Sequence, residues 1–91
     1  MTQGKQVWNV VPGVRFRRLL DEAVLTSPHH SESFVLNDTA ANFVECLDGA
    51  RTVDEIAVDM AGRFGVSVEQ LALDLAPFIK QLAAEGVIDT V

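Results

Sequence analysis

The sequence has one cysteine, two histidines and no tyrosine, and these shortages exclude several kinds of site. A single cysteine, Cys46, cannot form an internal disulfide, and His29 and His30 are not accompanied by further ligands at the spacing of a zinc site. Adjacent histidines in a stretch rich in turn formers are typical of solvated loop residues. We therefore expect no metal, no cofactor and no redox role.

Long apolar runs and an excess of basic residues are also missing. The longest apolar stretch falls well short of the roughly 18 residues that suggest a membrane span, and the opening MTQGKQVWNV is unlike a signal peptide. Thirteen acidic residues against seven basic ones give a net charge of −6, which disfavours nucleic acid as a partner. A chain of 91 residues forms one domain with one core, and we expect it in the cytoplasm with no membrane partner.

Two short amphipathic helices around an Asp-Gly turn organise the chain. The first is predicted from apolar residues at i, i+3, i+4 and i+7, which are Ala40, Phe43, Val44 and Leu47. Asn37 and Asp38 can cap its start, and Gly49 can supply a left-handed residue at its end. The second helix follows a predicted capping box of Thr52 and Glu55. A turn this short makes the pair a helix-turn-helix by geometry.

A third, longer helix is predicted between Ser67 and Gly86. Ser67 and Gln70 have the spacing of another capping box, and Gly86 closes the helix. Asp74 borders the main apolar stripe, whose members are Val68, Leu71, Leu75, Phe78 and Leu82. We expect Leu73 on the opposite side from Asp74, where it could belong to a second docking surface.

Before the helices, alternating polarity predicts three short strands over residues 14–20, 23–26 and 33–36. Phe34 and Leu36 are expected to face the helices. The predicted fold class is therefore α+β, with a small three-stranded antiparallel sheet packed on three helices, and one border of the sheet has unpaired backbone groups. Residues 1–13 are expected to form a loosely ordered N-terminal arm.

No catalytic constellation is evident, and the charges do not favour DNA binding. No base stands beside Cys46 in the sequence, so an enzyme is disfavoured. The only basic cluster, Arg15, Arg17 and Arg18, fits either a solvated strand face or recognition of an acidic peptide. A DNA-binding helix-turn-helix is opposed by the charges of the third helix, where Glu69, Asp74 and Glu85 stand against Lys80.

Several ordered pieces of the sequence resemble one family of binding modules. They are residues 36–41 (LNDTAA), residues 47–56 (LDGARTVDEI), Asp74-Leu75, Phe78-Ile79, Leu82 and residues 86–88 (GVI). Over about residues 14–91 this set resembles the PqqD-type recognition elements of ribosomally made peptide natural products. The resemblance implies a winged helix-turn-helix-like domain over residues 14–91. It also implies a precursor leader peptide, bound as an added strand in a cleft between the third strand and the third helix.

Within that family, Leu47-Asp48-Gly49 stands where the pyrroloquinoline quinone members have Cys-Asp-Gly. The chain is more similar to the free-standing leader-binding subunits of lasso-peptide pathways, which hand the precursor to a separate leader peptidase and a cyclase. A PqqD-type chaperone with a radical SAM partner and a helix-turn-helix transcription factor are the alternatives. The resemblance implies a peptide-binding site made of Ser33, Phe34, Val35, Leu36, Leu71, Asp74, Leu75 and Phe78. Leu36 and Leu75 fit the hydrophobic core equally well.

Overall fold

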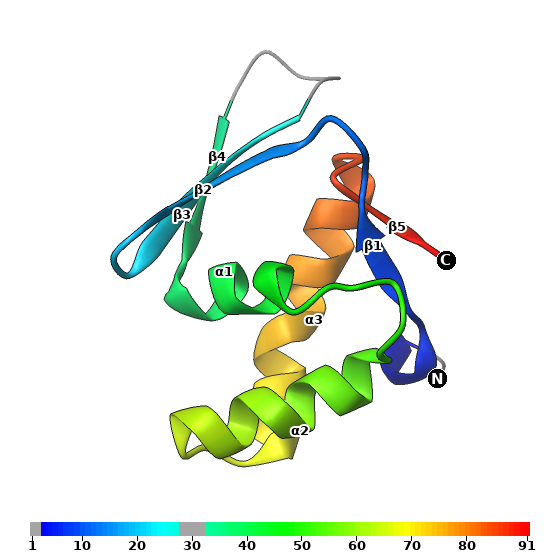
Figure 1. Cartoon of the computed structure of the whole chain (residues 1–91). Helices are drawn as coiled ribbons and strands as arrows, with labels where there is room; N and C mark the ends of the chain where they lie inside the picture. Colours follow the sequence, from blue (N-terminus) through cyan, green and yellow to red (C-terminus); the bar gives the residue numbers. More distant parts are fainter. Residues whose placement is uncertain (1–2, 28–32) are drawn as a thin grey trace.

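The computed structural model describes residues 3–27 and 33–91, and it confirms the predicted α+β class (Figure 1). His29 and His30, predicted in a turn, lie outside the described residues. In chain order the elements are η1 (Gln3–Lys5), β1 (Trp8–Val10), β2 (Arg15–Leu19), β3 (Glu22–Thr26), β4 (Ser33–Asn37), α1 (Asp38–Glu45), α2 (Val53–Phe64), α3 (Val68–Ala84) and β5 (Ile88–Thr90).

Strands β2, β3 and β4 form the predicted antiparallel meander, in that spatial order. The alternation holds along each strand, so Ala23, Leu25 and Leu36 are buried against the helices while Val35 is 66% exposed on the other face. Within the described residues β4 pairs only with β3, which leaves its second edge without a strand partner. The sheet therefore has an open edge directly before α1.

The start of α1 is as predicted, but its end is not. The Asn37 side chain accepts a hydrogen bond from the Ala40 amide at 2.9 Å, which caps the helix. The helix ends at Glu45, before Gly49, because the next residues form a turn held by Asp48. One oxygen of the Asp48 carboxylate accepts hydrogen bonds from the amides of Ala50 and Arg51, so the left-handed Gly49 lies inside this turn.

The capping box of α2 is confirmed, whereas the one predicted for α3 is only half formed. Glu55 N donates to Thr52 Oγ1 at 3.1 Å, and Thr52 N donates to Glu55 Oε1 at 2.7 Å. Ser67 accepts from the Gln70 amide at 3.1 Å. The Gln70 side-chain amide, however, donates to the Asp74 carboxylate at 3.0 Å. The two residues are at i and i+4 of the helix, so their side chains lie on the same face.

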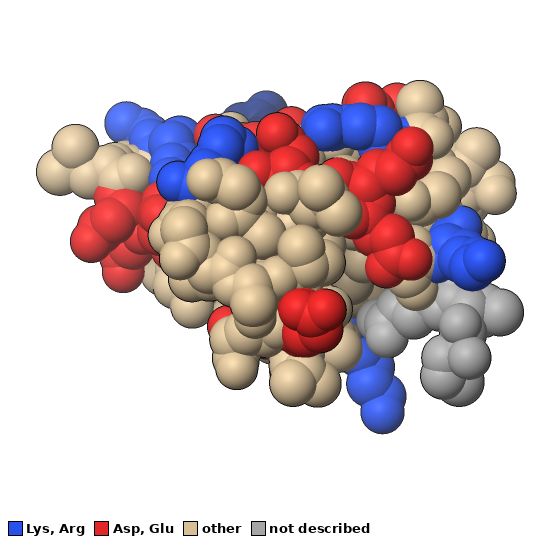
Figure 2. Space-filling model, turned by 90° about the horizontal axis from the view of Figure 1, so that it is seen from below, with Lys and Arg blue, Asp and Glu red and all other residues tan. Residues whose placement is uncertain are grey.

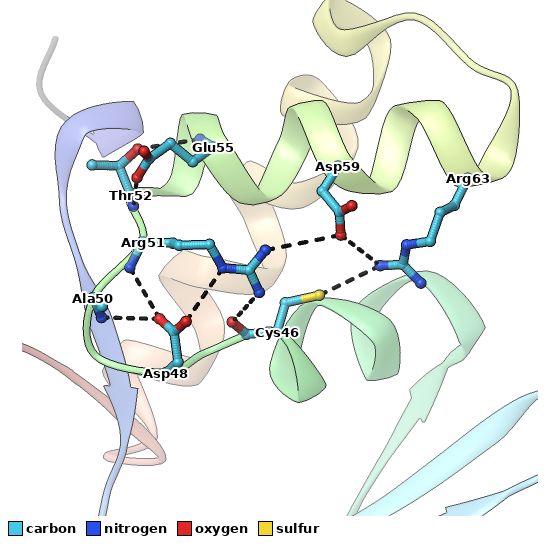
Figure 3. A network of polar contacts seen from close by, with 8 residues as sticks. All are labelled: Cys46, Asp48, Ala50, Arg51, Thr52, Glu55, Asp59 and Arg63. Atoms are coloured by element: carbon cyan, nitrogen blue, oxygen red, sulfur yellow. Dashed lines mark hydrogen bonds and ion pairs between the residues drawn. The ribbon is translucent and has the colours of Figure 1, made fainter.

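Arginine side chains join the turn before α2 to both neighbouring helices (Figure 3). Arg51 donates to the carbonyl of Cys46 at 3.1 Å and approaches the carboxylates of Asp48 and Asp59, at 3.3 and 3.9 Å. Arg63 contacts Asp59 at 3.4 Å and the Cys46 sulfur at 3.4 Å. These contacts fasten the end of α1 to α2 at a point where few backbone hydrogen bonds could do so.

The N-terminal segment is attached to the domain, so the expected loose arm is wrong for residues 3–13. Strand β1 pairs antiparallel with β5, and Trp8 is half-buried against the core. Val53 N, in the first turn of α2, donates to the carbonyl of Gln6 at 3.0 Å. Sequence patterns missed the pairing because each strand has only three residues, too few for an alternation to be recognised. The two-stranded β1–β5 ribbon lies apart from the three-stranded sheet, on the other side of the molecule (Figure 1).

The core fills the space between the three helices and the inner face of the sheet. Its largest fully buried side chains are Leu25 from β3, Phe43 from α1, Ile56 and Met60 from α2, Leu71, Leu75 and Ile79 from α3, and Val87. Among the described residues no helix is long and apolar enough to cross a membrane.

Candidate functional site: the cleft between β4 and α3

A hollow of about 270 Å³ lies between β4 and the second half of α3. It is lined by Ser33, Phe34, Val35, Leu36, Phe78, Gln81, Leu82 and Glu85, and we call it the strand–helix hollow. Five of the eight predicted site residues therefore lie together: the four of β4 and Phe78. The open edge of β4 and this hollow belong to the same surface, since the strand lines the hollow along most of its length.

Leu71 and Leu75 do not line this hollow. They are 2% and 0% exposed and belong to the hydrophobic core, so their predicted place in the wall is wrong. The reason is the packing of α3 among the helices: α2 lies across its first half (Figure 1), and both leucines belong to the shared core. Only from Phe78 onward does the stripe turn toward β4.

Asp74 lines a second hollow, of about 320 Å³, which we call the Asp74 hollow. Its lining residues are Asn37, Thr39, Leu73, Asp74, Pro77 and Phe78. Phe78 thus borders both hollows. Leu73 shares this hollow with Asp74, which corrects the expectation that the two lie on opposite sides. Adjacent residues of a helix are about 100° apart, so both can reach one wide surface when their i+4 neighbours, Pro77 and Phe78, complete it.

The polar groups around the two hollows are acidic or neutral. The Asp74 carboxylate accepts a hydrogen bond from Gln70, and the hydroxyl groups of Ser33 and Thr26 are hydrogen-bonded at 3.2 Å. Neither lining set contains a lysine or arginine. The surface therefore offers backbone groups of β4, apolar contacts and a carboxylate, which suits an extended, uncharged or basic peptide better than an anion.

Within the described residues, Cys46 lies beside an arginine. The thiol is half-buried, and the guanidinium of Arg63 donates to its sulfur at 3.4 Å. In the part of the chain that the structure describes, no three His, Cys, Asp or Glu side chains gather as a metal-binding group would require.

Sequence reasoning missed six of the residues that line the two hollows. On α3, Gln81, Leu82 and Glu85 follow Phe78 at i+3, i+4 and i+7, so helical spacing from Phe78 could have found them. Asn37, Thr39 and Pro77 carried no such signal. The first two belong to the junction of β4 with α1, whose geometry depends on tertiary packing.

Comparison with known proteins places this cleft in a family context. Residues 22–88 match the family model described as coenzyme PQQ synthesis protein D (PqqD). The PqqA binding protein of Rhizobium meliloti (strain 1021) is 31% identical over 90 residues, which cover 97% of this chain and 90% of the relative.

Two solved structures share the fold. The PqqD truncation of Methylobacterium extorquens PqqCD, described as a stand-alone RiPP recognition element, has a TM-score of 0.81 and 26% identity, covering 98% of this chain and 99% of that one. TbiB1, solved with the TbiA(beta) leader peptide, has a TM-score of 0.77 and 20% identity, covering 89% of this chain and 94% of that one, and shows the fold alone. Because the family model spans most of the sequence and the R. meliloti relative matches almost all of it, this chain belongs to the PqqD family.

Proposed function

We propose that the chain is a non-catalytic recognition element that binds the leader segment of a ribosomally synthesised precursor peptide. The observation that carries the proposal is the open edge of β4 beside two adjoining hollows. Support comes from the family: the R. meliloti relative is named for binding PqqA, and the M. extorquens domain is described as a RiPP recognition element. The proposed binding unit is residues 14–91.

The mechanism is β-strand addition. A leader strand beside β4 pairs its backbone with the edge that faces away from β3, which provides affinity with little dependence on sequence. Every second side chain of that strand, about 6.8 Å apart, then points toward α3. Because Phe78 borders both hollows, consecutive inward side chains of the leader can occupy them, and these pockets select the leader.

The finer proposal is that the protein acts in the cytoplasm and delivers the precursor to the leader peptidase and cyclase of a lasso-peptide pathway. The residues Leu47-Asp48-Gly49 before α2 support this assignment. The alternative is a PqqD-type chaperone that presents its peptide to a radical SAM enzyme, and the 31% identity to the PqqA binding protein favours it.

A DNA-binding role is less well supported. The third helix carries Glu69, Asp74 and Glu85 against Lys80, and its first half is covered by α2. Figure 2 shows the face on the side of α2, where acidic and basic side chains are mixed around the edge and the centre is largely uncharged. This face therefore lacks the continuous basic surface that phosphate binding requires.

Calorimetric titration with leader peptides tests the proposal. The probes are synthetic leaders of the precursor encoded beside this gene, of a lasso precursor and of PqqA, with a scrambled leader as control. We expect one leader to bind with a Kd near the micromolar range or tighter, about −8 kcal/mol or better. Which leader binds decides between the two pathways. No saturable heat with any of them at tens of micromolar would refute leader binding.

A further inference from the structure

The outer face of the three-stranded sheet carries a second surface, on the opposite side from α3. Five residues define it, and we call it the outer sheet face: Arg15 and Arg17 of β2, Val24 and Thr26 of β3, and Val35 of β4. Strand register places Arg17, Val24 and Val35 in one row across the sheet and Arg15 beside Thr26 in the next. The face is therefore one continuous surface.

Its shape and polarity differ from those of an ordinary solvated face. A hollow of about 620 Å³, lined by Arg15, Phe16, Arg17, Val24 and Thr26, lies at its β2 side. Val35, at the other end of the same row, is 66% exposed. The guanidinium groups of Arg15 and Arg17 thus lie beside the apolar side chains of this hollow. Such a surface can bind a partner whose carboxylates surround an apolar patch.

Among the described residues the two arginines of this face form no ion pair, although Glu22 lies on the same face of β3. Arg18, Arg51 and Arg63 each contact a carboxylate, of Asp38, Asp48 or Asp59. Arg15 and Arg17 have no acidic partner within 4.0 Å in the described ranges, although the chain has a net charge of −6. Two like charges on alternate residues of one strand face lie about 6.8 Å apart and repel each other, so an acidic partner would stabilise them.

The proposed mode of leader binding connects this face with the cargo. A strand added beside β4 continues the rows of the sheet, so its outward side chains come to lie next to Val35. A protein seated on the outer sheet face would then contact the leader as well, from the side that α3 does not cover. This step rests on the proposed function.

We propose that the outer sheet face docks the enzyme that processes the bound precursor, through an acidic surface with an apolar centre on that enzyme. Arg15 and Arg17 supply the charge complementarity, and Val24 and Val35 the apolar contact. The leader, once bound, enlarges the same interface, so the enzyme binds the loaded protein more tightly than the free one.

The test measures the affinity of this protein for the purified processing enzyme by surface plasmon resonance, with and without saturating leader. The variant R15E/R17E should lower that affinity at least tenfold while leaving leader affinity within twofold. The matched control K5E/K80E makes the same change of charge on exposed residues outside this face. It should leave both affinities unchanged, and thermal melts should show that both variants are folded.

Several results would overturn the docking surface. They are equal enzyme binding by R15E/R17E and the wild-type chain, an equal loss in K5E/K80E, or no measurable wild-type affinity for the enzyme. Binding of the wild-type chain to phosphatidylglycerol vesicles in place of the enzyme would assign the face to a membrane and also overturn it. Failure of the leader titration, by contrast, refutes the proposed function. Enzyme binding without leader is measured separately, so the two failures are distinguishable.

Discussion

Leu36 of β4 and Phe78 of α3 line the same hollow, although one lies directly before the first helix and the other in the second half of the last. Leu36 is 6% exposed, whereas Phe78 is only partly buried. Of these two side chains, Phe78 is therefore the more accessible and the better candidate for an anchor.

Replacing Phe78 with alanine should weaken leader binding about tenfold or more, because this aromatic side chain borders both hollows. Calorimetric titration of the variant measures the change. Lys80→Ala on the same helix is the matched control, since Lys80 is exposed and lines neither hollow. If F78A lowers thermal stability while the folded protein binds the leader normally, Phe78 is a core residue.

Leu75→Ala should act in the opposite way. The side chain is fully buried, so its truncation should cost about 2–5 kcal/mol of unfolding free energy through lost contacts and a cavity. Urea unfolding gives this value, and the affinity of the folded fraction for the leader should stay within twofold. A loss of affinity without a loss of stability would return Leu75 to the binding wall.

The local signals in the sequence predicted the N-caps of the helices and the strand faces well, and they failed chiefly where tertiary contacts decide. Thr52 with Glu55 and Asn37 with Ala40 interact over three residues, so the sequence contains both partners. The periodicity of α3 showed a single stripe, but it could not show that Leu75 is buried in the core while Phe78 stays partly exposed. Pairing of β1 with β5 joins the two ends of the chain, and no short-range pattern encodes it.

Thr52→Ala should destabilise the protein by about 1 kcal/mol, because it removes the hydroxyl that accepts a hydrogen bond from the Glu55 amide. For a domain of this size that corresponds to a fall in Tm of about 4–8 °C, measured by circular dichroism. Thr52→Ser retains the hydroxyl and should stay close to the wild type. An unchanged Tm for T52A would show that the capping box is not a significant source of stability.

The turn before α2 should make stability depend on acid pH. Hydrogen bonds from the backbone amides of Arg51 and then Ala50 lower the pKa of Asp48 below its usual value of 3.8 (Figure 3). Below that value the unfolded chain binds a proton more readily than the folded one. The contribution of Asp48 is therefore complete above pH 3.8 and is lost as the pH falls through the lowered pKa of the folded state.

Asp48→Asn should accordingly reduce the slope of unfolding free energy against pH in this acid range, as measured by urea titrations at closely spaced pH values. Asp89→Asn serves as the control, since Asp89 is exposed on strand β5. The same slope in D48N and the wild type would show that Asp48 titrates normally in the folded protein.

Strand addition to β4 is the central claim, and amide hydrogen exchange followed by NMR, with and without saturating leader, tests it most directly. We predict that the amides gaining most protection on leader binding lie within residues 33–37, on the edge that faces away from β3, while those of residues 15–19 change little. Unchanged exchange along β4 at full occupancy, with new protection along β2 or the β1–β5 ribbon, would contradict it.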